Sequence, residues 1–281
     1  MPRDNGAVWQ LSRKIPIRQT CCLGSGPDHD QEKRKKMHTI FGGKHLIILA
    51  LCAVTMVAGF LFARKKTTDQ LTRILLVIGL ISEIIKVFYY TMANEATHGG
   101  VLPKTDLPFH LCSIQILFFG VQVYSKNEKL KELLLSFMIP SCLFGGIAAL
   151  LIATNSSLNG GLILTVQYFG YHVAITVFAM ALLFGGKFRL TMRHYVNCLK
   201  FLVVLMLFAM YINSILFDGV SNINFMYVAS PPQSGLPFLT EEYGWLVYIC
   251  HYAFTVVFCV SLCYIKPIFA AIRGKKTKAA A

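Results

Sequence analysis

Cys112 and the histidines are the residues of this sequence best suited to covalent chemistry. Cys112 follows His110 by two positions inside an apolar stretch, and a spacing of two turns side chains on a helix about 200° apart. A nucleophilic Cys112 therefore needs its general base from another segment, and His172 and His251 are the candidates. A cation such as Lys86 would favour the thiolate form. The alternative is an inert thiol that fills space between helices.

The histidines also belong to a candidate metal set. Three imidazoles and one carboxylate form a donor set that suits zinc or iron, and these groups are His110, His172, His251 and Glu83. No local His-x-x-x-His or Glu-x-x-His spacing links them, so the four groups would have to converge from separate helices. Interhelical hydrogen bonds are the alternative role for such residues. The sequence predicts no other cofactor.

Further polar side chains are candidates for binding a substrate. They are Glu83, Lys86, Asn213, Asn222, Asn224 and His251. Glu83 and Lys86 lie three residues apart, so they share a helix face and can neutralise each other, either for a reaction or for packing alone. Asn222 and Asn224 belong to a long connection, residues 218–244, that contains no Lys or Arg. Such a connection is either a lid over a site or an ordinary solvated loop.

Long apolar runs must position these side chains. Of the 281 residues, 55% are apolar and 14% are charged, and the mean hydropathy is +0.57, which excludes an ordinary water-soluble domain. Lys and Arg outnumber Asp and Glu 27 to 13, but they cluster in short stretches between the apolar runs. That pattern is typical of membrane topology and not of nucleic-acid binding. The nine cysteines form no Cys-x-x-Cys pair and predict neither a disulfide framework nor a zinc knuckle.

The apolar runs predict an all-α membrane bundle with seven transmembrane helices. A run of about 18 or more apolar residues can cross the hydrocarbon core as a helix, whereas barrel strands would be shorter and alternating. The predicted spans are Leu46–Ala63, Ile74–Met92, Leu107–Tyr124, Leu133–Ala153, Leu162–Phe184, Leu199–Phe217 and Trp245–Ile265. Pro108 falls in the first turn of the third span, where proline is tolerated. Ser141, Gly145, Gly146 and Ala149 give the fourth span a stripe of small residues suited to close helix packing.

The distribution of Lys and Arg predicts the orientation of the bundle. The connections after spans one, three and five and the tail 266–281 carry nearly all the basic residues of the membrane domain, whereas those after spans two, four and six hold Lys104 alone. The positive-inside rule then places the C-terminus in the cytoplasm and the N-terminus outside. We expect three parts: a basic N-terminal extension (1–43), the membrane domain (44–265) and a cytoplasmic tail (266–281).

The basic residues of the N-terminal extension contradict this orientation, because they would have to be translocated. Residues 32–36 read Glu-Lys-Arg-Lys-Lys directly before Met37, and purine codons alone can encode all five. Such a tract resembles a translated bacterial ribosome-binding site. The conflict means either that this extension is not native or that the first span is misassigned. We favour the first explanation, and our hypothesis is that translation starts at Met37.

The polar candidates fall at similar depths in the predicted spans. At 1.5 Å per residue they lie about 5 to 14 Å from the outer ends. This set is Glu83, Lys86, His110, Cys112, His172, Asn213 and His251. Because intramembrane ionisable groups are costly, their common depth predicts one polar cavity that opens outward.

Four short motifs resemble those of the YwaF-like integral membrane proteins and their animal relatives, the transmembrane protein 164 family. They are Glu83-Ile-Ile-Lys86, Leu107-Pro-Phe-His-Leu-Cys112, Tyr168-Phe-Gly-Tyr-His172 and Asn222-Ile-Asn-Phe-Met226 followed by Pro231. The resemblance covers residues 44–265. It implies thiol-dependent acyl transfer onto lysophospholipids, as in the animal branch, with His110, His172, Asn222, Asn224, Glu83, Lys86 and His251 at polar positions of the family.

The chain departs from the animal pattern at the implied nucleophile. That pattern reads Pro-Cys-His-Leu, whereas this chain reads Pro108-Phe109-His110-Leu111. Cys112 stands three residues after Phe109, so on a continuous helix both would share one face.

Three functions remain open at this point. One is a lipid acyltransferase or hydrolase of the cell membrane that uses either the Cys112 thiol or metal-activated water. Another is a carrier for small solutes or protons, and the third is a non-catalytic membrane protein. The expected partners are membrane lipids and not nucleic acids, and the sequence identifies no protein partner.

Overall fold

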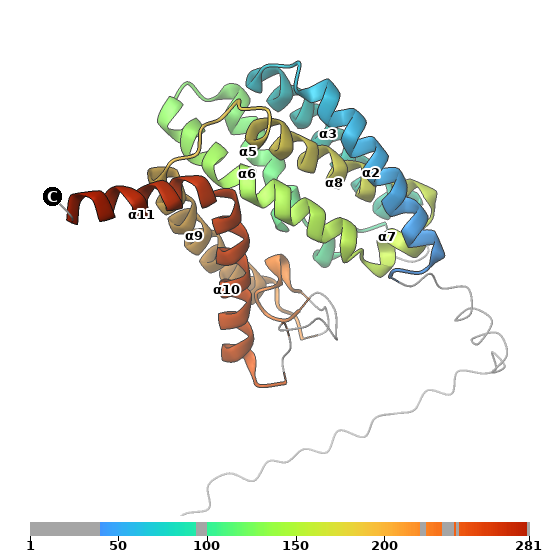
Figure 1. Ribbon diagram of the computed structural model, residues 1–281. Coiled ribbons are helices and arrows are strands. Elements are labelled where there is room, and N and C mark those ends of the chain that lie inside the picture. Colours follow the sequence, from blue (N-terminus) through green and yellow to red (C-terminus); the bar gives the residue numbers. More distant parts are fainter. Residues whose placement is uncertain (1–39, 94–99, 220–222, 232–238, 240–241, 280–281) are drawn as a thin grey trace, which may run out of the picture. The chain divides into compact units, whose positions relative to one another are not determined.

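The computed structural model describes residues 40–93, 100–219, 223–231, 239 and 242–279 (Figure 1). The predicted N-terminal extension and Met37 lie almost entirely outside these residues. The α-helices are α2 (Gly43–Ala63), α3 (Thr68–Phe88), α5 (Leu111–Tyr124), α6 (Glu128–Leu151), α7 (Asn155–Asn159), α8 (Leu162–Leu183), α9 (Met192–Leu216), α10 (Trp245–Cys263) and α11 (Ile265–Ala279). One π-helical turn (η1, Tyr89–Ala93) and two 3-10 turns (η2, Lys104–Asp106; η3, Phe225–Tyr227) complete the elements. The described part of the chain contains no strand, which confirms the all-α prediction.

Each predicted span corresponds to a helix, and five helices are long and apolar enough to cross a membrane: α2, α6, α8, α9 and α10. The protein is therefore a multi-pass membrane protein. Helix α5 has only 14 residues, and α3 is not among the helices that are both long and apolar enough to cross. Seven crossings and the N-out, C-in orientation stay predictions.

Helix α5 is short because its predicted first turn is not helical. Leu107, which precedes Pro108, is extended (φ −59°, ψ 151°), as expected for a residue before proline. His110 is the residue that caps the helix, also with an extended backbone (φ −68°, ψ 152°). The prediction that Pro108 lies in the first turn of this helix is therefore wrong, and the helix begins three residues later.

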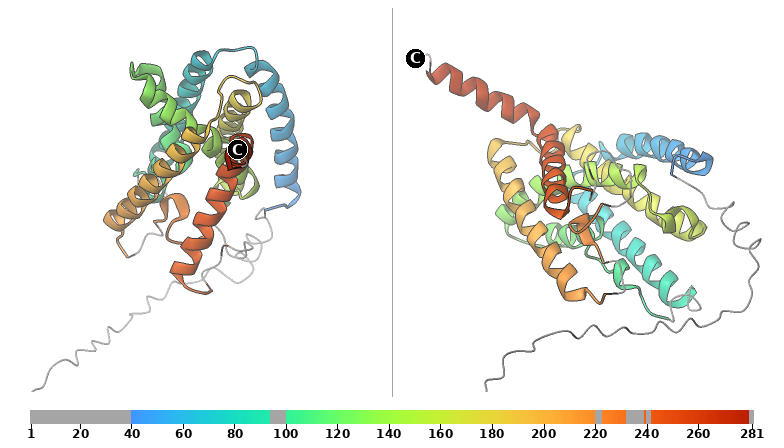
Figure 2. Two further views of the ribbon diagram at one scale, coloured as in Figure 1. Left: turned by 60° about the vertical axis from the view of Figure 1, so that its left-hand side comes forward. Right: turned by 90° about the horizontal axis from the view of Figure 1, so that it is seen from below.

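Helices α6 and α8 form the centre of the bundle. Within the most apolar 18-residue stretch of each, 61% of residues are buried, against 11% for α2 and α9 and 22% for α10. Helix α8 packs against α2, α3 and α6, and α6 packs also against α5, α9 and α10. Figures 1 and 2 show α9 and α10 set apart from α2. The site candidate on α8, His172, is thus carried by one of the two most enclosed helices.

Glycine at position 146 lets α6 and α8 approach closely. A Cβ atom at Gly146 would overlap the hydroxyl oxygen of Thr176 and come within 3.1 Å of the His172 carbonyl oxygen. A Cβ at Gly145 would only touch a Leu111 methyl group at 3.5 Å, an ordinary contact. One member of the predicted small-residue stripe therefore sets the distance between the two central helices.

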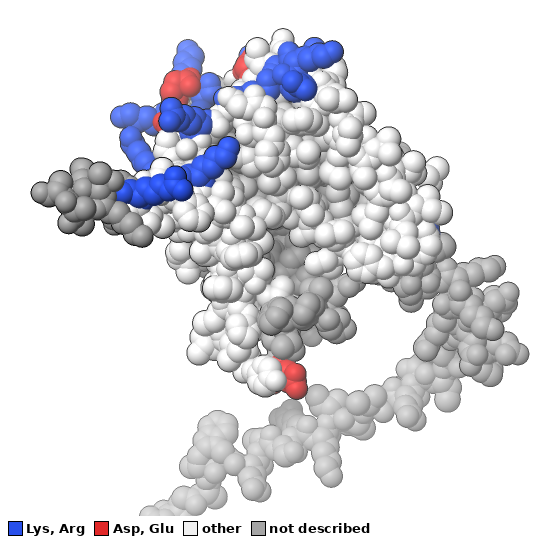
Figure 3. Space-filling view, in the orientation of Figure 1, with Lys and Arg blue, Asp and Glu red and all other residues white. Residues whose placement is uncertain are grey.

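The connections after α2 and α8 meet at one end of the bundle, where the beginnings of α6 and α9 are also joined. Lys187 Nζ donates to the carbonyl oxygens of Arg64 (3.1 Å) and Lys66 (2.5 Å), and His194 Nε2 donates to Glu132 Oε1 (2.6 Å). Figure 3 shows Lys and Arg gathered at this end, which we call the basic end. This separation of charge follows the pattern from which the cytoplasmic side is predicted.

We predict that Gly146→Ala lowers stability although alanine favours helix formation over glycine by about 1 kcal/mol. Forcing a methyl group between α6 and α8 should cost about 1–3 kcal/mol and shift the thermal unfolding midpoint in detergent downward. Gly145→Ala is the matched control, and it should leave the midpoint unchanged or raise it. Equal midpoints for the two variants would show that α6 and α8 have room for a methyl group at position 146.

Candidate functional site

The polar candidates that the structure brings together lie where α3 ends and α5 begins, the end opposite the basic end. The Nζ atom of Lys86 lies 2.7 Å from Glu83 Oε1, and the two side chains are 13% and 22% exposed. This Oε1 accepts no further hydrogen bond from the described residues. Lys86 is also in electrostatic range of His110 and Cys112. The predicted mutual neutralisation on one helix face is confirmed.

Cys112 occupies the first turn of α5 and faces the central helices. Its carbonyl oxygen accepts a hydrogen bond from the Tyr171 hydroxyl at 2.8 Å, which ties α5 to α8. Its thiol is in electrostatic range of Tyr168, Tyr171, Tyr227 and also Cys142 of α6. Groups from α6, α8 and the connection between α9 and α10 therefore lie within electrostatic range of this thiol.

His172 is buried on α8 beside these tyrosines, with 4% of the residue exposed. Its Nδ1 lies 2.7 Å from the carbonyl oxygen of Tyr168, and its ring centroid lies 4.3 Å from that of Tyr168. A carbonyl oxygen only accepts, so Nδ1 carries the proton, and in the neutral ring Nε2 is an acceptor. Spacings of three and four residues place Tyr168, Tyr171 and His172 on neighbouring parts of one helix surface.

His110 is covered by the connection between α9 and α10. We call residues 223–231 of this connection the strap. The His110 ring lies 5.0 Å from the ring of Phe225 and 5.7 Å from that of Tyr227. Burial raises the pKa of Tyr227 to about 12, so its hydroxyl keeps its proton and remains a donor at neutral pH.

The strap is held from both neighbouring helices. Asn213 of α9 pairs with the backbone of Phe225: Oδ1 accepts from the amide at 2.9 Å, and Nδ2 donates to the carbonyl at 3.3 Å. Three α10 side chains donate to three consecutive strap carbonyls. These bonds run from Tyr252 to Met226 (2.7 Å), from Tyr248 to Tyr227 (2.5 Å) and from Trp245 to Val228 (3.0 Å).

The strap backbone is strained where it carries these bonds. Met226 and Tyr227 have positive φ angles of 56° and 53°, a conformation that is unfavourable for residues other than glycine. Asn224 closes the same turn from within, because its Nδ2 donates to the Ser230 carbonyl (2.7 Å) and its Oδ1 accepts from the Ala229 amide (3.1 Å). Surrounding hydrogen bonds thus hold a conformation that the chain alone would not favour.

Several predicted site residues take other places. His251 is exposed on α10, where its backbone carbonyl accepts a hydrogen bond from the Thr255 hydroxyl. The side-chain amides of Asn213 and Asn224 are hydrogen-bonded to the strap backbone, so the structure assigns these residues to holding the strap. Asn222 lies outside the described residues. No three His, Cys, Asp or Glu side chains in the described part of the chain are grouped to hold a metal ion, so the set of His110, His172, His251 and Glu83 does not converge.

The sequence interpretation missed the residues that join these elements. They are Tyr168, Tyr171, Tyr227 and Trp245, together with the intramembrane amides of Gln115 (2.9 Å to Ser141) and Gln167 (2.7 Å to Ser82). His45, fully buried one residue before the predicted first span, joins α2 to the Leu150 carbonyl at 2.9 Å. Hydroxyl and amide groups within apolar runs were the available signal, because hydrocarbon offers them no other partner.

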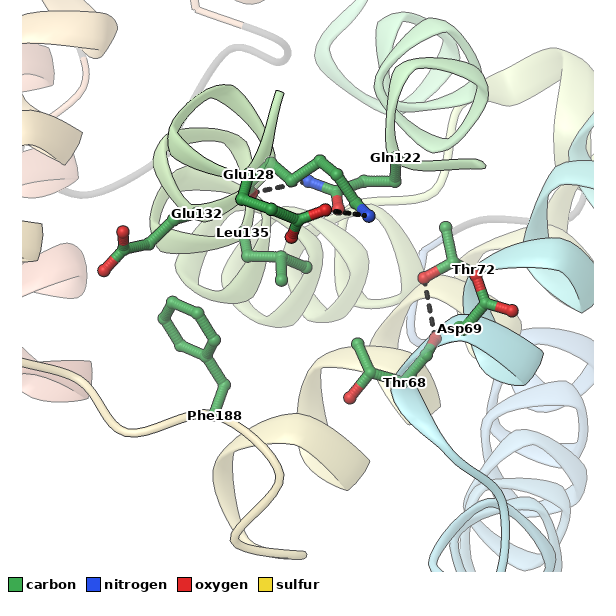
Figure 4. Close-up of a pocket in the computed structure, with 9 residues that line it drawn as sticks. Thr68, Asp69, Thr72, Gln122, Glu128, Glu132, Leu135 and Phe188 are labelled. Atoms are coloured by element: carbon green, nitrogen blue, oxygen red, sulfur yellow. Dashed lines mark hydrogen bonds and ion pairs between the residues drawn. The ribbon is translucent and has the colours of Figure 1, made fainter. Parts of the chain in front are cut away.

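The larger of two notable pockets lies at the basic end, not at the predicted outward-facing site. It has a volume of about 280 Å³ and lies among α3, α6 and Phe188 (Figure 4). Its carboxylates already have cationic or histidine partners: Asp69 with Arg73, Glu128 with Lys131, and Glu132 with His194. Neither pocket is lined by His110, Cys112 or His172. The strap rings stand against His110, where the sequence predicts an open polar cavity.

Comparison with known proteins identifies one family. A family model described as the TMEM164 family matches residues 40–264, which include every helix from α2 to α10. No curated protein and no solved structure matches the chain significantly.

We predict that removing one member of the Glu83–Lys86 pair destabilises the protein more than removing both. Glu83→Gln leaves a mostly buried ammonium group unpaired and should cost about 2 kcal/mol or more, whereas Glu83→Gln with Lys86→Met should recover most of this loss. Unfolding in detergent measures both. Arg73→Met is the matched control on the same helix: it breaks the exposed pair with Asp69 and should cost less than about 1 kcal/mol.

We also predict that Asn213→Ala loosens the strap. The variant leaves the amide and carbonyl of Phe225 without partners, at a cost of about 1–3 kcal/mol, so hydrogen exchange in residues 223–231 should accelerate about tenfold or more. Ser214→Ala is the control, because the Ser214 hydroxyl donates to the Met210 carbonyl of its own helix. Unchanged exchange in the Asn213 variant would show that α10 alone holds the strap.

Proposed function

The chain belongs to the TMEM164 family, and from this premise we propose that it is an integral membrane enzyme that transfers or hydrolyses acyl groups of membrane lipids. We propose that it works in the cell membrane with the strap end facing outward. The family match and the apolar helices support a multi-pass membrane protein. The chemistry proposed below draws its support from the surroundings of Cys112.

One observation carries the proposal: groups from separate elements gather around the Cys112 thiol. Lys86 supplies a positive charge, Tyr227 supplies a hydroxyl from the strap, and the Tyr171 hydroxyl of α8 holds the backbone carbonyl of Cys112. A thiolate needs nearby cations and donors to form inside a membrane protein. An inert packing cysteine needs none of these.

The proposed reaction begins with the thiol proton of Cys112 passing to a histidine. The sulfur then attacks the ester carbonyl of a phospholipid, forming a C–S bond as the C–O bond breaks. The histidine returns the proton to the departing alkoxide, which leaves as a lysophospholipid hydroxyl. The thioester is next attacked by a hydroxyl of another lysophospholipid, which completes transfer, or by water, which completes hydrolysis. In either case a C–O bond forms as the C–S bond breaks, and the histidine takes the proton of the attacking group and returns it to the Cys112 sulfur.

We assign the base role to His172. The proton on Nδ1 leaves Nε2 as the basic nitrogen, and the adjacent Tyr171 bonds to the Cys112 backbone, so the two residues are carried by directly connected parts of α8 and α5. The Tyr227 hydroxyl and the Lys86 ammonium are the groups suited to stabilise the oxyanion. His110, held between strap rings, is assigned to positioning.

Phe109, at the position of the animal nucleophile, is not equivalent to Cys112 in this structure. Its ring lies 5.4 Å from that of Phe225 and 6.1 Å from that of Phe208 of α9. Because α5 begins only at Leu111, Phe109 and Cys112 do not share the helix face predicted from their spacing. The support for Cys112 as the nucleophile therefore comes from its neighbouring groups and not from the position of Phe109 in the family motif.

We predict that an alkyne-tagged acyl phospholipid in nanodiscs forms a hydroxylamine-sensitive adduct on Cys112. Cys112→Ser should abolish this adduct, and His172→Gln should slow its formation about 100-fold or more, because a positioned base contributes about 10² to 10⁴. Mass spectrometry of the modified peptide measures both.

Cys250→Ser is the control, because Cys250 is exposed on α10 and tests whether accessibility alone explains labelling. Full acyl transfer by Cys112→Ser would refute the assignment. If deletion of the gene changes solute uptake and leaves phospholipid and lysolipid profiles unaltered, the protein is a carrier and not this enzyme.

A further inference from the structure

A second, apolar pocket lies between α5, α9 and α10, and Met226 of the strap forms part of its wall. Its volume is about 50 Å³, and it is lined by Leu111, Leu202, Leu205, Met206, Met226 and Tyr252, among others. The Tyr252 hydroxyl already donates to the Met226 carbonyl. A ligand in this pocket would therefore meet almost only hydrocarbon and thioether surface.

This pocket shares its walls with the proposed reaction site. Leu111 is the residue between His110 and Cys112, and Met226 is the residue between Phe225 and Tyr227, whose rings contact His110. The same two segments thus line the apolar pocket and supply the polar and aromatic groups around Cys112. A molecule with an apolar chain in the pocket would have its polar end beside those groups.

The surroundings of the pocket are lipid-facing. Helices α9 and α10 expose apolar side chains along their length, for example Val203, Leu207 and Phe254, which are 57%, 61% and 72% exposed. In a multi-pass membrane protein these faces meet lipid acyl chains. Two of the helices that line the pocket thus also present apolar faces to acyl chains.

The size of the pocket limits what it can hold. Small-molecule sites usually enclose about 300 Å³ or more, so about 50 Å³ accommodates only a segment of a ligand. A lipid fits this limit, because the rest of its chain can remain in the bilayer.

We propose that this apolar pocket receives an acyl chain of the lipid substrate, which enters from the bilayer between α9 and α10 and brings its ester to Cys112. This inference rests on the proposed function for the chemistry, but the binding itself does not require a reaction. The occupant is a membrane phospholipid, and neither a soluble cofactor nor a protein segment fits a small pocket whose surroundings face lipid.

The test is photo-crosslinking with a phosphatidylcholine that carries a diazirine in one acyl chain, at low mole fraction in nanodiscs. We expect saturable crosslinks to residues 202–206 and to Met226. Leu202→Trp fills the pocket from a partly buried position and should reduce these crosslinks about fivefold or more. Leu207→Trp, on the exposed face of the same helix, is the matched control and should leave them unchanged.

Val256→Phe, which fills the pocket from α10, provides a second variant if Leu202→Trp does not fold. Crosslinks that rise linearly with probe fraction, equally in all variants, would overturn the proposal and indicate bulk lipid contact only. Retention of saturable crosslinks in Cys112→Ser with no adduct in the wild type would support the pocket and refute the enzyme. A Cys112 adduct without saturable pocket crosslinks would refute the pocket and leave the enzyme standing.

Discussion

The close contact between α6 and α8 determines where most of the site residues lie. Because Gly146 has no side chain, the α6 backbone reaches the His172 carbonyl and the Thr176 hydroxyl. This fixes the depth and rotation of α8, and from that position Tyr168 reaches the Ala149 carbonyl (3.0 Å) and Tyr171 reaches the Cys112 carbonyl. In hydrocarbon a hydroxyl has no water to bond, so each of these bonds also holds the helices in register.

The strap depends on a different constraint. Three consecutive carbonyls, those of Met226, Tyr227 and Val228, accept bonds from one helix. An extended chain alternates the direction of successive carbonyls, so pointing three of them at α10 requires a tight turn, and Met226 and Tyr227 adopt the left-handed conformation to make it. Strain of about 1–3 kcal/mol per residue is offset by these bonds and by the paired bonds of Asn213.

The sequence predicts the helices and the Glu83–Lys86 pair well, because both depend on local periodicity. A run of apolar residues predicts a helix wherever that helix packs, and a spacing of three predicts a shared face. The predicted start of α5 is wrong by four residues, because Leu107 before the proline is extended, Pro108 and Phe109 form a turn, and His110 is again extended before the helix begins at Leu111. Local rules do not state which helix face meets which neighbour.

Depth alone was therefore insufficient to predict the site. His251 has a depth similar to that of His172, yet α10 turns it outward while α8 turns His172 into the core. Asn213 is predicted to bind substrate, but its amide pairs with the backbone of Phe225, twelve residues away along the chain. The rotation of each helix about its axis is set by tertiary contacts such as that of Gly146. These contacts cannot be predicted from a single sequence by local rules.

The arrangement divides the molecule into an enclosed part and a lipid-facing part that meet at Cys112. The thiol is carried by α5, whose first turn is tied to α8, whereas the strap and the apolar pocket belong to α9 and α10. Displacing the strap would break bonds to Asn213 and to the α10 side chains but none of those that hold Tyr171, His172 and Cys112. A lipid could therefore reach the proposed nucleophile through rearrangement of the lipid-facing part, while Tyr171, His172 and Cys112 keep their geometry and Tyr227 moves with the strap.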